Sequence, residues 1–141
     1  MKTRTLVSLL LAGFIAQLTS APAGAQDIDS MAPVVVKTVP EAGSKEVAPG
    51  VVEIKVTFSK EMGDRSWSWA TAWEDSQPES IGEPRYESDH RTCVLKVKLE
   101  PNKTYGYWIN SGKFHNFKDK AVMRLCPICW CSKPKLGDSG T

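Results

Sequence analysis

Short runs of alternating apolar and polar residues, separated by turn-forming residues, limit what this chain can fold into. The run 51–58 places four apolar side chains on one face of a strand: Val52, Ile54, Val56 and Phe58. The run 91–99 does the same with Cys93, Leu95, Val97 and Leu99. Because side chains alternate across a strand, each run predicts a strand with one buried face. A helical period is missing between residues 33 and 119, so the sequence predicts an all-β fold, an antiparallel β-sandwich.

Three more runs predict strands, at residues 34–39, 66–73 and 104–110. The polar stretch 74–89 contains two prolines and a glycine, and it predicts a long loop with at most one short edge strand, near Arg85 and Tyr86. Five clear strands are fewer than the roughly seven of an immunoglobulin-like sandwich. We therefore expect the sandwich to lack its normal final strand.

The first 25 residues have the features of a secretory signal peptide. Lys2 and Arg4 precede an apolar run over residues 6–18, and the small residues of Ala23–Ala25 suit cleavage near Ala25. The apolar run is shorter than the roughly 20 residues that span a bilayer, so no membrane span is expected in the mature chain. Residues 26–32 are expected to form a flexible leader. The expected location is secreted, periplasmic or at the cell surface.

Charge argues against nucleic-acid binding. Two of the 18 basic residues lie in the expected signal peptide, so the rest of the chain balances the 16 acidic residues. A neutral domain has no basic footprint for phosphate.

The sequence 39–43 (Val-Pro-Glu-Ala-Gly) and the sequence 54–62 (Ile-Lys-Val-Thr-Phe-Ser-Lys-Glu-Met) resemble the opening of a bacterial Ig-like domain. The family concerned is the SbsA-type family, named for an S-layer protein. The turn at 99–105 (Leu-Glu-Pro-Asn-Lys-Thr-Tyr) also resembles this family, and it has the arrangement of a tyrosine corner. The resemblance covers residues 33–121, the expected sandwich domain.

The resemblance implies an Ig-like sandwich that acts as a non-catalytic secreted module for structural spacing or for protein or surface interaction. Its expected partner is a protein or a cell-surface glycan. Neither the resemblance nor the sequence implies a cofactor. The sequence contains no Ser-His-Asp order, no HExxH motif and no Gly-rich phosphate loop, so an enzyme is not expected.

Residues 122–141 depart from the family pattern. After Ala121 the family shows a Gly-Asn turn and a final apolar strand, whereas this tail holds three cysteines, Cys126, Cys129 and Cys131. Codons can be chosen for residues 119–135 so that one inserted cytosine restores a Gly-Asn pair and an apolar strand. We therefore hypothesise that the tail is frameshifted or disordered, or that it fills the final strand's place poorly.

A second interpretation of the tail is chemical. The C-x-x-C spacing of Cys126 and Cys129, extended by Cys131, suits a metal or a redox dithiol, with Cys93 as a fourth thiolate. One C-x-x-C is half of a zinc signature, and an exported protein favours disulfides such as Cys126–Cys129. A metal- or thiol-active tail is thus an alternative function.

Aromatic residues carry the other functional hint. Trp67 and Trp69 have inward parity and are expected in the core, as is usual for tryptophan in Ig sandwiches. Trp73, Tyr86 and Trp108 are the candidate ligand-binding residues, because exposed aromatic rings form a platform for sugars or peptides. An aromatic carbohydrate- or peptide-binding platform is the first alternative function.

Overall fold

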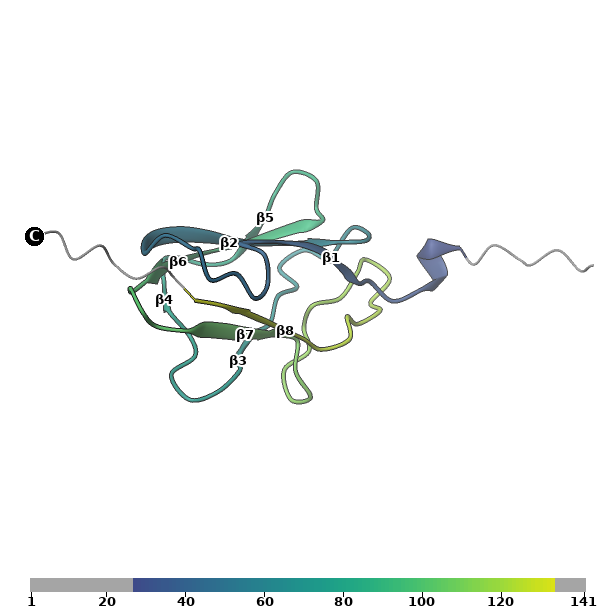
Figure 1. Ribbon diagram of the computed structural model, residues 1–141. Helices are drawn as coiled ribbons and strands as arrows, with labels where there is room; N and C mark the ends of the chain where they lie inside the picture. The colour runs from purple at the N-terminus through teal and green to yellow at the C-terminus, as the bar shows by residue number, and fades with distance from the viewer. Residues whose placement is uncertain (1–26, 134–141) are drawn as a thin grey trace, which may run out of the picture.

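The computed structural model describes residues 27–133, which form two packed antiparallel sheets (Figure 1). A short 3-10 turn, η1 (Ile28–Ser30), precedes the strands. The strands are β1 (Val35–Val39), β2 (Gly50–Phe58), β3 (Trp69–Thr71), β4 (Glu79–Ser80), β5 (Arg85–Tyr86), β6 (Thr92–Leu99), β7 (Tyr105–Ile109) and β8 (Ile128–Ser132). The expected signal peptide at 1–25 lies outside the described residues.

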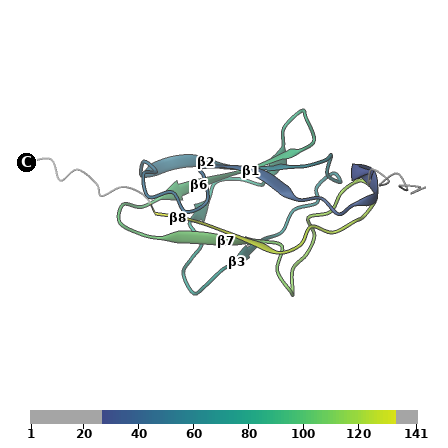
Figure 2. The ribbon, with the colours of Figure 1, turned by 45° about the vertical axis from the view of Figure 1, so that its right-hand side comes forward.

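One sheet has the order β1-β2-β6-β4, with β5 also paired to β6, and the other has the order β3-β7-β8. Figure 2 shows the two sheets as two layers, with β1, β2 and β6 in one and β3, β7 and β8 in the other. The longest pairing joins β2 to β6 over eight residue pairs, from Gly50–Leu99 to Thr57–Thr92. These are the two strands with the clearest apolar alternation, and the expected all-β sandwich is confirmed.

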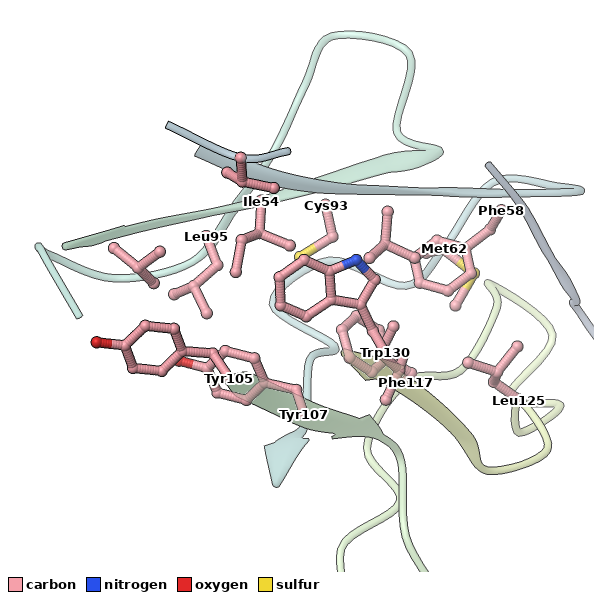
Figure 3. Close-up of a cluster of buried hydrophobic side chains, with 14 of the residues drawn as sticks. Ile54, Phe58, Met62, Cys93, Leu95, Tyr105, Tyr107, Phe117, Leu125 and Trp130 are labelled. Atoms are coloured by element: carbon pink, nitrogen blue, oxygen red, sulfur yellow. The ribbon is translucent and has the colours of Figure 1, made fainter. Parts of the chain in front are cut away.

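The core lies between the sheets. Ile54, Val56 and Phe58 of β2 face Tyr107 and Ile109 of β7, and all five are buried. Figure 3 shows Trp130 of β8 reaching into the same space. The inward parity read from the sequence therefore matches the burial in both β2 and β7.

The final strand is present, contrary to the expectation that the sandwich lacks it. β8 pairs with β7 over five residues, from Tyr105–Ser132 to Ile109–Ile128. The Trp130 side chain is 1 % exposed, and its Nε1 donates to the Pro40 carbonyl at 2.9 Å. The physical reason is a short alternation inside the tail, in which Trp130 and Ser132 turn inward and the cysteines between and beside them turn outward.

The tyrosine corner is confirmed at the turn between β6 and β7. Tyr105 is buried, and its hydroxyl accepts a hydrogen bond from the Glu100 backbone N–H at 3.0 Å. Asn102 takes a left-handed conformation in this turn, with φ of 63°. The corner fixes where β7 begins, and therefore which of its residues face the core.

Candidate functional site

Trp73 covers the outer side of the β3-β7-β8 sheet. β3 ends at Thr71, and the Ser76 hydroxyl then accepts hydrogen bonds from the backbone N–H groups of Ala72 (3.0 Å) and Trp73 (3.2 Å). The Ser76 carbonyl in turn accepts from the Gly106 N–H at 2.9 Å. This turn folds the Trp73 indole over Gly106, where an added Cβ would lie 2.4 Å from the ring.

Trp108 lies on the same outer face. It alternates with the buried Tyr107 and Ile109, and it pairs with Cys129 of β8. Gly106, under the Trp73 ring, pairs with Cys131. Directly paired residues share one face of a sheet. We call the surface made by Trp73, Gly106, Trp108, Cys129 and Cys131 the outer face.

Tyr86 belongs to the other sheet, so the structure does not bring it to Trp73 and Trp108. Its hydroxyl donates to the Ser66 carbonyl at 2.7 Å, and its ring lies 6.3 Å from that of Trp67. Burial raises the pKa of Tyr86 well above its ordinary value, although the hydrogen bond to Ser66 opposes this shift. In this position the Tyr86 hydroxyl serves to anchor the segment before β3.

The cysteines do not gather. All four are free thiols, and within residues 27–133 no group of three or more His, Cys, Asp or Glu side chains is placed to hold a metal ion. Cys126 and Cys129 are exposed, and Cys131 is partly buried. Burial, and then the neighbouring Cys131, raise the pKa of the Cys129 thiol. Cys93 is buried in the core, where burial raises its pKa to about 12.

Sequence reasoning missed Ser76 and Gly106, the two residues that position Trp73. Ser76 accepts a hydrogen bond from the Trp73 N–H, and Gly106 leaves room for the Trp73 ring. The isolated glycine within the run 104–110 was an available signal, because a glycine inside a strand often marks close approach of another group. Nothing in the sequence pointed to Ser76, because its hydrogen bonds form in a turn after β3. The alternation of residues 66–73 predicted a continuous strand there. Trp73 shares the parity of Trp67 and Trp69, yet the chain has already left the strand when it reaches Trp73.

The paired antiparallel sheets and the tyrosine corner define an immunoglobulin-like β-sandwich. The chain belongs to the bacterial Ig-like domain family, whose model matches residues 29–123. Among solved structures, the chain is similar to the S-layer protein rSbsC(31-844), with a TM-score of 0.50 and 14 % sequence identity over 74 % of the chain. The match spans 14 % of that protein's length. The comparison with curated proteins found no match.

Both matches agree with the Ig-like fold that the structure shows. None of the helices that the structure describes has the length and apolar character to cross a membrane.

Proposed function

We propose that this protein is a non-catalytic Ig-like module, exported to the cell surface or medium, which spaces or attaches the groups at its two ends. The observation that carries the proposal is the path of the chain. The described chain enters at η1, passes through both sheets, and leaves after β8 at the opposite end of the long axis (Figure 1, Figure 2). Because the chain enters at one end and leaves at the other, the module separates the groups attached to its two ends by its full length.

The likeness to a small part of an S-layer protein supports this role, because that protein belongs to a surface layer. The expected signal peptide supports export. A sandwich whose core is packed between two sheets is also suited to keep a fixed separation between its ends.

Two experiments test the proposal. Cells that express the full chain with a C-terminal epitope tag are labelled with an impermeant biotin reagent after the outer barrier is opened or left intact. We expect the tag in the exported or surface fraction, with the mass of a chain cleaved near Ala25. Recovery of an uncleaved chain from the cytoplasm would contradict export.

The spacing role is tested separately by small-angle X-ray scattering of two copies joined head to tail by a short linker. We expect a maximum dimension roughly twice that of one copy, because each copy enters and leaves at opposite ends. Two copies that pack side by side, with little gain in length, would count against spacing.

A second candidate function is binding of a glycan or peptide on the outer face. The observation that favours it is Trp73, which is 43 % exposed and whose indole lies so close to Gly106 that a Cβ there would come within 2.4 Å of the ring. Gly106→Ala keeps both tryptophans but displaces the Trp73 ring, so it should weaken binding as much as Trp73→Ala does. Val36→Ala, which trims an exposed apolar residue of the other sheet, is the matched control. Equal quenching of tryptophan fluorescence by glycans in all variants would exclude this site.

A further inference from the structure

A hollow lined by basic side chains lies beside the connection from β7 to β8, at the end of the sandwich where η1 enters (Figure 1, Figure 2). Its volume is about 420 Å³, and its basic lining residues are Lys113, His115, Lys118 and Arg124. Of the described residues that line this basic hollow, none is acidic. Because bases and acids balance over the chain after residue 25, the basic hollow is a local excess of positive charge.

Two of these residues, Lys118 and Arg124, lie directly opposite each other in a short antiparallel bridge. The backbone hydrogen bonds fall on the residue pairs to either side, from the Asp119 N–H to the Met123 carbonyl and from the Leu125 N–H to the Phe117 carbonyl, both at 3.0 Å. Lys118 and Arg124 therefore form a non-hydrogen-bonded pair, the kind whose Cα atoms are only about 4.5 Å apart and whose side chains lie closest. Both side chains leave the same face of the hairpin.

This pairing sets two positive charges against each other. Like charges directly opposite on paired strands destabilise the pairing. Within residues 27–133, neither Lys118 nor Arg124 forms an ion pair. The neighbouring Asp119 does not serve as their counterion, because it is buried and pairs with Lys60 at 2.8 Å. An anion held between Lys118 and Arg124 would remove the repulsion.

The basic hollow also has an aromatic border. Phe114 is 57 % exposed, and Lys113 Nζ lies 5.6 Å from the centroid of its ring. Trp67 lines the hollow from the segment before β3 and is half-buried. An exposed aromatic ring offers a surface on which the apolar face of a sugar ring packs. The hollow therefore combines a place for an anionic group with a place for a sugar ring.

We propose that the basic hollow binds an acidic polysaccharide through its hexuronate units. One carboxylate lies between Lys118 and Arg124 and accepts hydrogen bonds from both, since the arginine fork matches the two oxygens of a carboxylate. The sugar ring that carries this carboxylate packs against Phe114, and Lys113 attracts the carboxylate of the next unit.

The backbone around the hollow favours a sugar over an acidic peptide. Extended peptides commonly bind by adding a strand to an open sheet edge. None of the described strands lines the hollow, which is built from the segments around residues 67–68, 113–118 and 122–124. The volume of the hollow lies within the range of about 300–1,000 Å³ that is usual for sites of small ligands, and it therefore suits individual sugar units.

The basic hollow is separate from the outer face, because neither Trp73 nor Trp108 lines it. Binding here also does not depend on the spacing role, since a module that spaces nothing can still hold a polysaccharide. The scattering experiment on joined copies therefore stands or falls independently of the binding experiment below.

The test is a titration of the full mature chain, followed by ¹⁵N NMR of the backbone amide signals. The probes are tetragalacturonate and tetramannuronate, with fully methyl-esterified tetragalacturonate as the matched neutral sugar and hexaglutamate as the acidic peptide. We expect at least one of the two acidic sugars to shift the signals of Lys118 and Arg124 in a saturable way. The neutral ester should leave them unchanged, and hexaglutamate should bind much more weakly.

A pair of double variants separates this site from a general effect of charge. Lys118→Gln with Arg124→Gln should weaken binding at least about tenfold, the effect of one lost charge-assisted hydrogen bond. Lys96→Gln with Lys98→Gln removes the same net charge from the exposed side of β6, and it should bind like the parent. Because Lys118 and Arg124 repel each other, replacing them should not lower the melting temperature of the free chain, so a loss of binding is not a loss of folding.

Phe114→Ala should weaken binding about fivefold, the effect of one lost aromatic contact. Equal losses of affinity in the two double variants would show that net charge alone governs binding, and would overturn the proposal. Signals of Lys118 and Arg124 that neither acidic sugar moves would overturn it as well. Binding of hexaglutamate as tight as that of the acidic sugars would assign the hollow to an acidic peptide instead.

Discussion

Asn110 holds together the two loops at one end of the sandwich. It is fully buried and takes a left-handed conformation, with φ of 59°. Its Nδ2 donates to the carbonyls of Phe117 (3.0 Å) and Leu125 (2.9 Å), and its Oδ1 accepts from the Phe117 N–H (2.8 Å). Asparagine tolerates this backbone region better than most residues. One side chain thus links the end of β7 to the approach to β8.

Asn110→Ala should lower the free energy of unfolding by about 3 kcal/mol, because it leaves the buried Phe117 N–H and Leu125 carbonyl unpaired. The Phe117 carbonyl loses one of its two donors and keeps the Leu125 N–H. Urea denaturation followed by tryptophan fluorescence measures the change. Asn116→Ala is the matched control, since Asn116 is exposed and makes one long hydrogen bond, and it should change stability by less than about 0.5 kcal/mol. Equal, small effects of both substitutions would show that Asn110 does not hold the loops.

Cys93 should be inert to thiol reagents in the folded protein. Its pKa of about 12 leaves almost no thiolate at pH 8, and its side chain is buried between the sheets. Labelling with a disulfide reagent at pH 8 should modify the exposed Cys126 and Cys129 first, and Cys93 only in urea. Raising the pH from 8 to 9.5 should still leave Cys93 unmodified in the folded protein, because its side chain stays buried. Rapid labelling of Cys93 without denaturant would contradict its burial.

At the scale of elements, the turn from Asp119 to Met123 stores backbone strain. The Val122 N–H donates to the Asp119 carbonyl, and the Met123 N–H donates to Asp119 Oδ1 at 2.8 Å. Val122 has φ of 68°, a left-handed conformation that a hairpin turn of this kind normally gives to glycine. A β-branched residue in this region is a genuine outlier, costing of order 1–3 kcal/mol.

Val122→Gly should therefore raise the free energy of unfolding by about 1 kcal/mol, after subtraction of the entropy that glycine adds to the unfolded chain. Thermal and urea denaturation both measure this gain. Ala121→Gly, one position earlier and outside the left-handed region, adds the same entropy without relieving strain, so it should be slightly destabilising. A loss of stability in both variants would rule out strain at Val122.

The strain at Val122 favours the proposal that the gene has lost a base. With the codons chosen above, one restored base places a glycine directly after Ala121, at the position where the backbone is left-handed. Sequencing across codons 117–125 and an intact mass of the product test this proposal. If the written frame is confirmed, the three tail cysteines are part of the protein as it is made.

Most of the strands could be predicted because each depends on local alternation. β1, β6 and β7 lie within the predicted runs, β2 begins one residue before its run, and Arg85 and Tyr86 form the predicted short strand. The aromatic site was predicted only in part, since Trp73 and Trp108 share a face through a turn that Ser76 makes. The burial of a polar atom such as Tyr107 Oη could not be predicted from the sequence, because it depends on how the two sheets pack against each other.

At the scale of the whole molecule, the last strand decides whether the sandwich is closed. Trp130→Ala should lower the free energy of unfolding by about 3–5 kcal/mol, a large share of the roughly 5–15 kcal/mol of a typical domain. It should also promote aggregation, because loss of β8 uncovers the edge of β7. Thermal melts with light scattering measure both effects. Cys129→Ala, on the outer side of the same strand, is the control, and equal destabilisation by both would contradict the inward role of Trp130.

The passage of the chain from one end to the other has a mechanical consequence. β1 and β8 are the first and last strands described, and they lie in different sheets. A pull between the two ends therefore runs along both strands and loads the β1–β2 and β7–β8 hydrogen bonds in shear. Bonds loaded in shear share the force and break together, whereas bonds loaded at a strand end open one at a time. Under tension the survival of this module is then set by its unfolding rate, and β8 bears the whole pull at its end of the sandwich.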